Sequence, residues 1–156
     1  MNRGRSEEVG VALDLFPEHL RERLKFDVFC GDPVFAGVAY YGTGLGSDGR
    51  YYGTTAHVLY PERAHDGKTT IVLPEDIGLA FTVHELAHVL DLSFDFDLPV
   101  EPVTWYARRN RHEAFAEAVT ALLVPGYPRT EGEAWGPPVA ERAWKQRRLV
   151  EALELH

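Results

Sequence analysis

The chain has 156 residues and a net charge of −8, and 45% of its residues are hydrophobic and 26% charged. These values predict a single globular domain spanning residues 1–156. They argue against a nucleic-acid-binding protein, because binding to phosphates depends on a basic surface. No segment approaches the roughly 20 apolar residues of a membrane span, and the N-terminus lacks the apolar core of a signal peptide. We therefore expect no membrane partner and a cytoplasmic location, with leaderless export left open.

Hydrophobic periodicity and turn residues predict strands in the first half of the chain and most of the helices in the second half. The predicted strands cover residues 26–41 (as a strand–turn–strand), 50–60 and 69–73, and a glycine-rich loop covers residues 42–49. The predicted helices cover residues 14–24, 75–91, 110–124 and 139–155. Strands followed by helices indicate an α+β fold.

The predicted helix 75–91 contains His84-Glu85-Leu86-Ala87-His88, which is the HExxH pattern. Residues four apart share one helical face, so both imidazoles can reach a single metal ion. Glu85 lies about 100° around the helix from His84, which suits contact with a metal-bound water rather than ligation. Apolar residues surround the motif, and burying these polar groups without partners would be costly. A metal ion removes that cost; the alternative is a pair of solvated or hydrogen-bonded histidines.

A catalytic zinc ion usually has three protein ligands, so a third is expected elsewhere. Glu113 and Glu117 lie four residues apart on the otherwise apolar predicted helix 110–124. We interpret Glu113 as the third ligand and Glu117 as the residue that accepts a hydrogen bond from an imidazole N–H and fixes its tautomer. Two alternatives stay open on spacing alone. Asn110 and Glu113 could form a capping box, or Glu117 could be the ligand.

The HExxH helix and the following glutamate helix together resemble the arrangement of the gluzincin metallopeptidases. More narrowly, residues 69–124 resemble the catalytic domain of the anthrax lethal factor family, on the pattern Tyr106-Ala107-x-x-Asn110-x-x-Glu113-x-Phe115-Ala116-Glu117-Ala118. The resemblance implies that Glu113 is the ligand, that Glu117 is the partner of a ligand histidine and that Tyr106 stabilises an oxyanion. It also implies that strand 69–73 forms the sheet edge along which a peptide aligns. The chain lacks the toxin's large accessory domains, so the toxin's substrate cannot be transferred.

The predicted protein is thus a compact single-domain zincin, with a small twisted sheet, that holds one Zn²⁺ per chain through His84, His88 and Glu113. Glu85 would take the proton of a zinc-bound water, and Tyr106 would donate to the oxyanion during endopeptidase cleavage of a peptide or protein substrate. One alternative is a small regulatory gluzincin that cleaves one specific protein, such as a repressor. Another is a non-catalytic, zinc-stabilised binding module, against which the presence of a general base argues.

Two further acidic features are less specific. Asp91, three residues beyond His88, fits equally an acid that supports the metal site and an acid that closes a helix. The acidic residues of the predicted loop 95–102 lack the glycine and the spacing of an EF-hand, so a solvated loop is expected.

The single cysteine, Cys30, excludes an intramolecular disulfide and suits a buried thiol. The oligomeric state is left open by the sequence.

Overall fold

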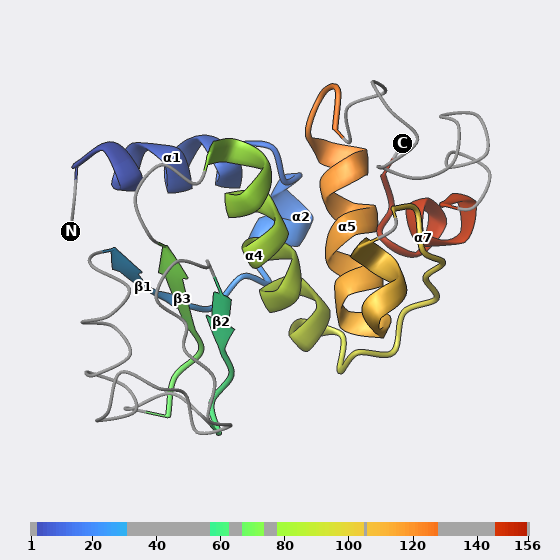
Figure 1. The fold of residues 1–156 in the computed structure, drawn as a ribbon, viewed down its shortest axis with the longest axis horizontal. Coiled ribbons are helices and arrows are strands. Elements are labelled where there is room, and N and C mark those ends of the chain that lie inside the picture. The colour runs from blue at the N-terminus through green and yellow to red at the C-terminus, as the bar shows by residue number, and fades with distance from the viewer. Residues whose placement is uncertain are drawn as a thin grey trace.

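The structure is a computed structural model that describes residues 3–30, 57–62, 67–73, 78–104, 106–127 and 146–155. Predictions that fall elsewhere, such as the loop 42–49 and residues 139–145 of the last predicted helix, lie outside the described residues. The described chain combines helices with a three-stranded sheet, which confirms the α+β class. In Figure 1 the strands lie together beside α4 (Gly78–Ser93), and the later helices lie on the other side of α4.

The sheet has the order β1-β3-β2, formed by β1 (Asp27–Cys30), β3 (Thr70–Leu73) and β2 (His57–Leu59). β1 runs parallel to β3, and β2 runs antiparallel to it, with Val58 opposite Ile71. All four residues of β3 are buried, and a continuous apolar run of this kind is typical of a central strand. The expectation that strand 69–73 forms the sheet edge is therefore wrong, because β3 has a neighbour on each side. Among the described strands, the antiparallel edge is β2.

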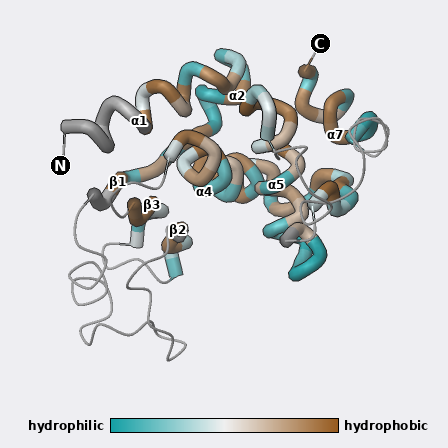
Figure 2. The backbone as a smooth tube through the Cα atoms, turned by 45° about the horizontal axis from the view of Figure 1, so that its top comes forward, coloured by the Kyte–Doolittle hydropathy of each residue, from teal (hydrophilic) through white to brown (hydrophobic). Residues whose placement is uncertain are grey.

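Helix α4 carries the HExxH motif and occupies the centre of the fold. Ten consecutive residues, from Thr82 to Asp91, are buried, because α4 contacts the sheet, α1 (Arg3–Asp14) and α5 (Arg111–Leu123). Figure 2 shows β3 and much of α4 in the brown of hydrophobic residues. The predicted helix 75–91 is confirmed from Gly78 onward and continues two residues further; residues 74–77 lie outside the described part.

Helix α5 matches the prediction of a helix over residues 110–124 almost residue for residue. Asn110 is its N-cap and Val124 its C-cap. The Asn110 side chain accepts a hydrogen bond from the Glu113 backbone N–H at 2.9 Å, which satisfies one of the free amides of the first helical turn. A short 3-10 helix, η1 (Tyr106–Arg109), precedes α5 and packs against it. This arrangement sets the first turn of α5 beside the middle of α4.

Among the described residues, the N-terminal end of the chain differs most from the prediction. The expected helix 14–24 is replaced by the end of α1 and the short helix α2 (Glu18–Arg21), because Pro17 interrupts the run as the N-cap of α2. No prediction covered α1, whose sequence has only a weak apolar stripe. At the other end, α7 (Arg147–Ala152) lies within the predicted helix 139–155, with Leu149 and Leu153 buried.

One hydrophobic core joins these elements, with contributions from α1, β3, α4, α5 and α7. Its largest fully buried side chains include Phe16, Leu20, Ile71, Leu86, Phe115 and Leu149. Among the described residues, no helix is long and apolar enough to cross a membrane.

Candidate metal centre

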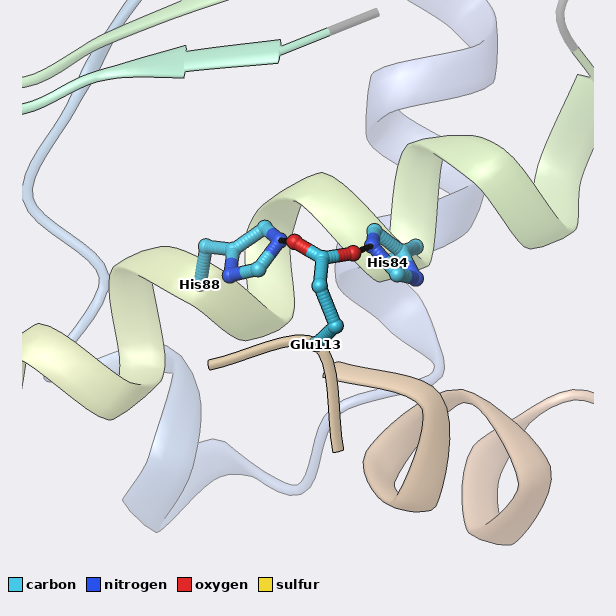
Figure 3. A group of neighbouring side chains, drawn as sticks. All are labelled: His84, His88 and Glu113. Carbon is cyan, nitrogen blue, oxygen red and sulfur yellow. Dashed lines mark hydrogen bonds and ion pairs between the residues drawn. The ribbon is translucent and has the colours of Figure 1, made fainter. Parts of the chain in front are cut away.

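The two histidines of α4 and Glu113 of α5 converge on one point (Figure 3). The Glu113 carboxylate lies between the rings, with Oε2 3.1 Å from His84 Nε2 and Oε1 3.1 Å from His88 Nε2. One ligand atom from each residue lies within 4.8 Å of the others. Two zinc–ligand bonds of about 2.0–2.1 Å at a tetrahedral angle would place their ligand atoms about 3.3 Å apart. The group could therefore hold a metal ion.

The backbone and the side chain of Glu113 make different contacts. Its N–H donates to the Asn110 cap, while its carboxylate faces the two histidines instead of returning to the N-cap amide. The alternative of a capping box is thus met only in its first half, the hydrogen bond from the Glu113 N–H to the Asn110 side chain. The first turn of α5 is fixed by the cap, and the Glu113 side chain is directed from that turn toward α4.

Glu117, one helical turn further along α5, lies on the other side of the His84 ring. It accepts a hydrogen bond from His84 Nδ1–H at 3.0 Å, whereas Glu113 faces Nε2. Both Glu117 oxygens also accept hydrogen bonds from hydroxyl groups: Thr104 at 2.9 Å, and Tyr127 at 2.9 and 2.8 Å. Glu117 is only 2% exposed. It is therefore placed to hold His84, and the alternative of Glu117 as ligand would need the metal on the Nδ1 side of the ring.

The carboxylates of Glu113 and Glu117 favour the positively charged form of His84. Burial alone would lower the pKa of His84, but its hydrogen bonds to Glu113 and Glu117 outweigh burial and raise that pKa to about 10. Burial alone would raise the pKa of Glu113. The hydrogen bonds from His84 and His88 outweigh burial and hold that pKa far below its usual range. Burial raises the pKa of Glu85, against the opposing effect of His88 and His84.

The contact between His84 and Glu113 shows whether the three side chains fit a metal ion. With its Nδ1–H donated to Glu117, neutral His84 would turn the lone pair of Nε2 toward the ionised Glu113 carboxylate. Two acceptors cannot share a contact of 3.1 Å without a cation between them. A proton on Nε2 can fill this role for His84 alone, and a divalent metal ion would do so with all three side chains. The donor set fits a metal, although its geometry does not select one ion.

Glu85 follows His84 on α4 and is 6% exposed. Among the described residues, no hydrogen bond is made to its carboxylate, and its oxygens are not among the side-chain atoms sealed from solvent. The described residues therefore leave the acceptor atoms of Glu85 without a hydrogen-bond donor. Tyr106 begins η1, but its side chain lies outside the described residues, so its predicted role is not tested.

Asp91 supports the site indirectly. Its carboxylate accepts two hydrogen bonds from Arg111 Nη1, at 2.9 and 2.8 Å, and Arg111 Nη2 donates to the Leu98 carbonyl at 2.8 Å. It does not bond His88, whose Nδ1 is buried without a partner in the described chain. Asp91 thus ties the C-terminal end of α4 to the start of α5, two residues before Glu113.

An Arg111→Met variant should lose about 3 kcal/mol of unfolding free energy, because it removes both Arg111 hydrogen bonds to the fully buried Asp91 carboxylate and leaves only His112 Nδ1, at 3.6 Å, near it. The measurement is urea unfolding followed by circular dichroism. The matched control is Arg21→Met, which breaks the exposed 3.4 Å pair with Asp14 and should cost less than about 1 kcal/mol. Equal losses in the two variants would contradict a structural role for the Asp91–Arg111 pair.

Sequence reasoning missed an aromatic cluster beside the site, formed by Tyr60, Phe96 and His112. The ring centroids of Phe96 and His112 lie 4.5 Å apart, and that of Tyr60 lies 5.6 Å from Phe96. Phe96 reaches this position through left-handed backbone conformations at Asp95 (φ 55°) and Phe96 (φ 57°), which are uncommon for residues other than glycine. Burial raises the pKa of Tyr60, and the negative charges of Asp91, Glu85 and Glu113 raise it further.

Thr104 and Tyr127 were missed as well. They lie 13 residues before and 10 residues after Glu117, and no local spacing connects either to a helix face. The only sequence signal was Pro125-Gly126, which predicts a turn and hence a return of the chain.

Comparison of the chain with known protein families, with curated protein sequences and with solved structures found no match.

Proposed function

We propose that this chain is a zinc-dependent endopeptidase of the gluzincin type, with a zincin fold similar to the catalytic domain of the lethal factor family. The observation that carries the proposal is the convergence of both Nε2 atoms and the Glu113 carboxylate, with Glu85 next to His84 on α4 and no hydrogen bond from the described residues to its carboxylate. Zinc sites of hydrolases combine three protein ligands with an open position. A purely structural site would have no need for an unbonded carboxylate next to its ligands.

The residues divide the proposed reaction among them. When bound, zinc would act as a Lewis acid toward the scissile carbonyl and increase the acidity of the attacking water. Glu85 accepts the proton from that water as the C–O bond forms, and delivers it to the amine as the C–N bond breaks. Glu117 holds Nδ1–H of His84 in a hydrogen bond, which leaves Nε2 as the ring nitrogen that would bind the metal. Tyr106 is the proposed donor to the oxyanion.

A peptide substrate would align with β2 rather than with β3. β2 is the antiparallel edge among the described strands and contacts α4, and an extended peptide can add to such an edge by backbone hydrogen bonds. Tyr60, which follows β2 directly, then brings the aromatic cluster to the same side of the site.

The proposal is tested by metal content and by access to the metal. Wild-type protein purified without a tag should carry one zinc ion per chain by mass spectrometry. A peptide hydroxamate should bind the zinc-loaded protein and not the metal-free protein, and the zinc-loaded protein should cleave a mixed peptide library. Absence of zinc uptake would remove the basis of the proposal. Zinc uptake without hydroxamate binding would instead favour the non-catalytic binding module.

A further inference from the structure

The Glu117 carboxylate is the centre of a buried network that draws donors from three separate segments. His84 comes from α4, Thr104 from the segment before η1, and Tyr127 from the turn after α5. Each Glu117 oxygen has two donor contacts: Oε1 has Thr104 and Tyr127, and Oε2 has His84 and Tyr127. A buried carboxylate with this many donors has no freedom to rotate without losing hydrogen bonds.

The position of Tyr127 depends on a specific turn. Residues 124–127 read Val-Pro-Gly-Tyr, Gly126 has φ 77°, and the Tyr127 N–H donates to the Val124 carbonyl at 3.2 Å. Proline followed by a glycine of positive φ is the sequence pattern of a type II turn. The turn reverses the chain at the end of α5, so that the tyrosine hydroxyl reaches back to Glu117.

Thr104 uses its hydroxyl twice. The O–H donates to Glu117 Oε1 at 2.9 Å, and the oxygen accepts the backbone N–H of Ala107 at 3.1 Å. Thr104 is 2% exposed and Ala107 is also buried. A continuous chain of hydrogen bonds therefore runs from η1, the helix that begins at Tyr106, through Thr104 and Glu117 to Nδ1 of His84.

We propose that Thr104 and Tyr127 are positioning residues, which fix the Glu117 carboxylate and thereby aim Nε2 of His84 at the metal. Thr104 has the additional effect of tying η1 to the same carboxylate. The inference rests on the proposed metal site for its effect on zinc, but its effect on His84 also exists without metal. Loss of a hydrogen-bond partner behind a ligand histidine typically weakens metal affinity about 10- to 100-fold.

The experiment compares four variants of the full chain: Tyr127→Phe, Thr104→Val, Thr104→Ser and Thr120→Val. Thr120 is the matched control, because it is a fully buried threonine of α5 whose hydroxyl donates to the Ala116 carbonyl and not to Glu117. Zinc affinity is measured by competition with a chelator. The Nδ1 proton of His84 is followed by NMR in protein labelled with ¹⁵N-histidine, both metal-free and zinc-loaded.

We expect Tyr127→Phe and Thr104→Val to bind zinc a fewfold to about 10-fold more weakly than wild type, at or below the lower end of the range for a direct partner of a ligand histidine, with faster solvent exchange of the His84 Nδ1 proton. Thr104→Ser keeps the hydroxyl and should restore both readouts, and Thr120→Val should match wild type. Amide exchange at Ala107 should accelerate in Thr104→Val and not in Tyr127→Phe, because only the former loses the tie to η1.

Folded Tyr127→Phe and Thr104→Val proteins with wild-type Nδ1 exchange would overturn the inference, and so would a Thr104→Ser variant as impaired as Thr104→Val. If Tyr127→Phe does not fold, the comparison of Thr104→Val with Thr104→Ser decides whether the network positions His84. Failure of wild-type protein to bind zinc would refute the proposed function, while the metal-free NMR comparison would still decide whether Thr104 and Tyr127 position His84.

Discussion

A Glu85→Gln variant should bind zinc as tightly as wild type and lose at least about 100-fold in the rate of peptide cleavage, the usual range for removal of a general base. Glutamine has nearly the same shape but cannot accept the proton of the attacking water. The described residues make no hydrogen bond to the Glu85 carboxylate, so the substitution removes no hydrogen bond from this part of the structure. Cleavage is measured on a fluorogenic peptide with zinc content determined on the same sample.

The same variant has a stability signature in the metal-free protein. Burial raises the pKa of Glu85 above its usual 4.5, so the ionised group lowers the stability of the folded state at neutral pH. This loss of stability disappears as the pH falls below the pKa of Glu85 in the unfolded chain, because the carboxyl group is then protonated in both states. Metal-free Glu85→Gln should therefore unfold at a higher temperature than wild type at pH 7, and the difference should shrink toward pH 4.5.

The control for Glu85→Gln is Glu101→Gln, which neutralises an exposed acid outside the site and should leave cleavage unchanged. Wild-type activity in zinc-loaded Glu85→Gln would exclude Glu85 as the base. Equal losses in the two variants would show that total charge, rather than Glu85, limits the rate.

Glu113→Ala should weaken zinc binding by at least about 100-fold, more than is typical for a residue that only supports a ligand. The Glu113 carboxylate contacts both histidines from α5, at 3.1 Å from each Nε2. Alanine keeps the backbone N–H that donates to Asn110, so the cap of α5 is preserved. Zinc affinity by chelator competition, with thermal unfolding as a check on folding, measures the effect.

Asn110→Ala supplies the reciprocal control for Glu113→Ala. It removes the cap of α5, which should cost about 1 kcal/mol of stability, and it leaves the three proposed ligands in place. Its zinc affinity should stay within a fewfold of wild type. Zinc retention in Glu113→Ala would move the third ligand to another residue, and a large loss in Asn110→Ala would show that helix stability, rather than ligation, controls zinc binding.

The local parts of this protein were predictable from sequence. The helix around His84 and His88, the bounds of α5 and its Asn110 cap all follow from residues within a few positions of one another. The register of His84 and His88 is set by the helical repeat itself. The weak stripe of α1 gave no such signal, and the helix expected over 14–24 failed because Pro17 separates two shorter helices.

The sequence by itself thus determined which side chains share a helix face and where α5 begins. Only the tertiary structure decided that Glu113 lies between the two imidazoles while Glu117 lies behind one of them. It also placed β3 in the middle of the sheet and brought Thr104 and Tyr127 to one carboxylate. The physical reason is the range of the interactions. Helix periodicity and capping act over one turn, whereas these contacts depend on how α4, α5 and their flanking turns pack around a shared core.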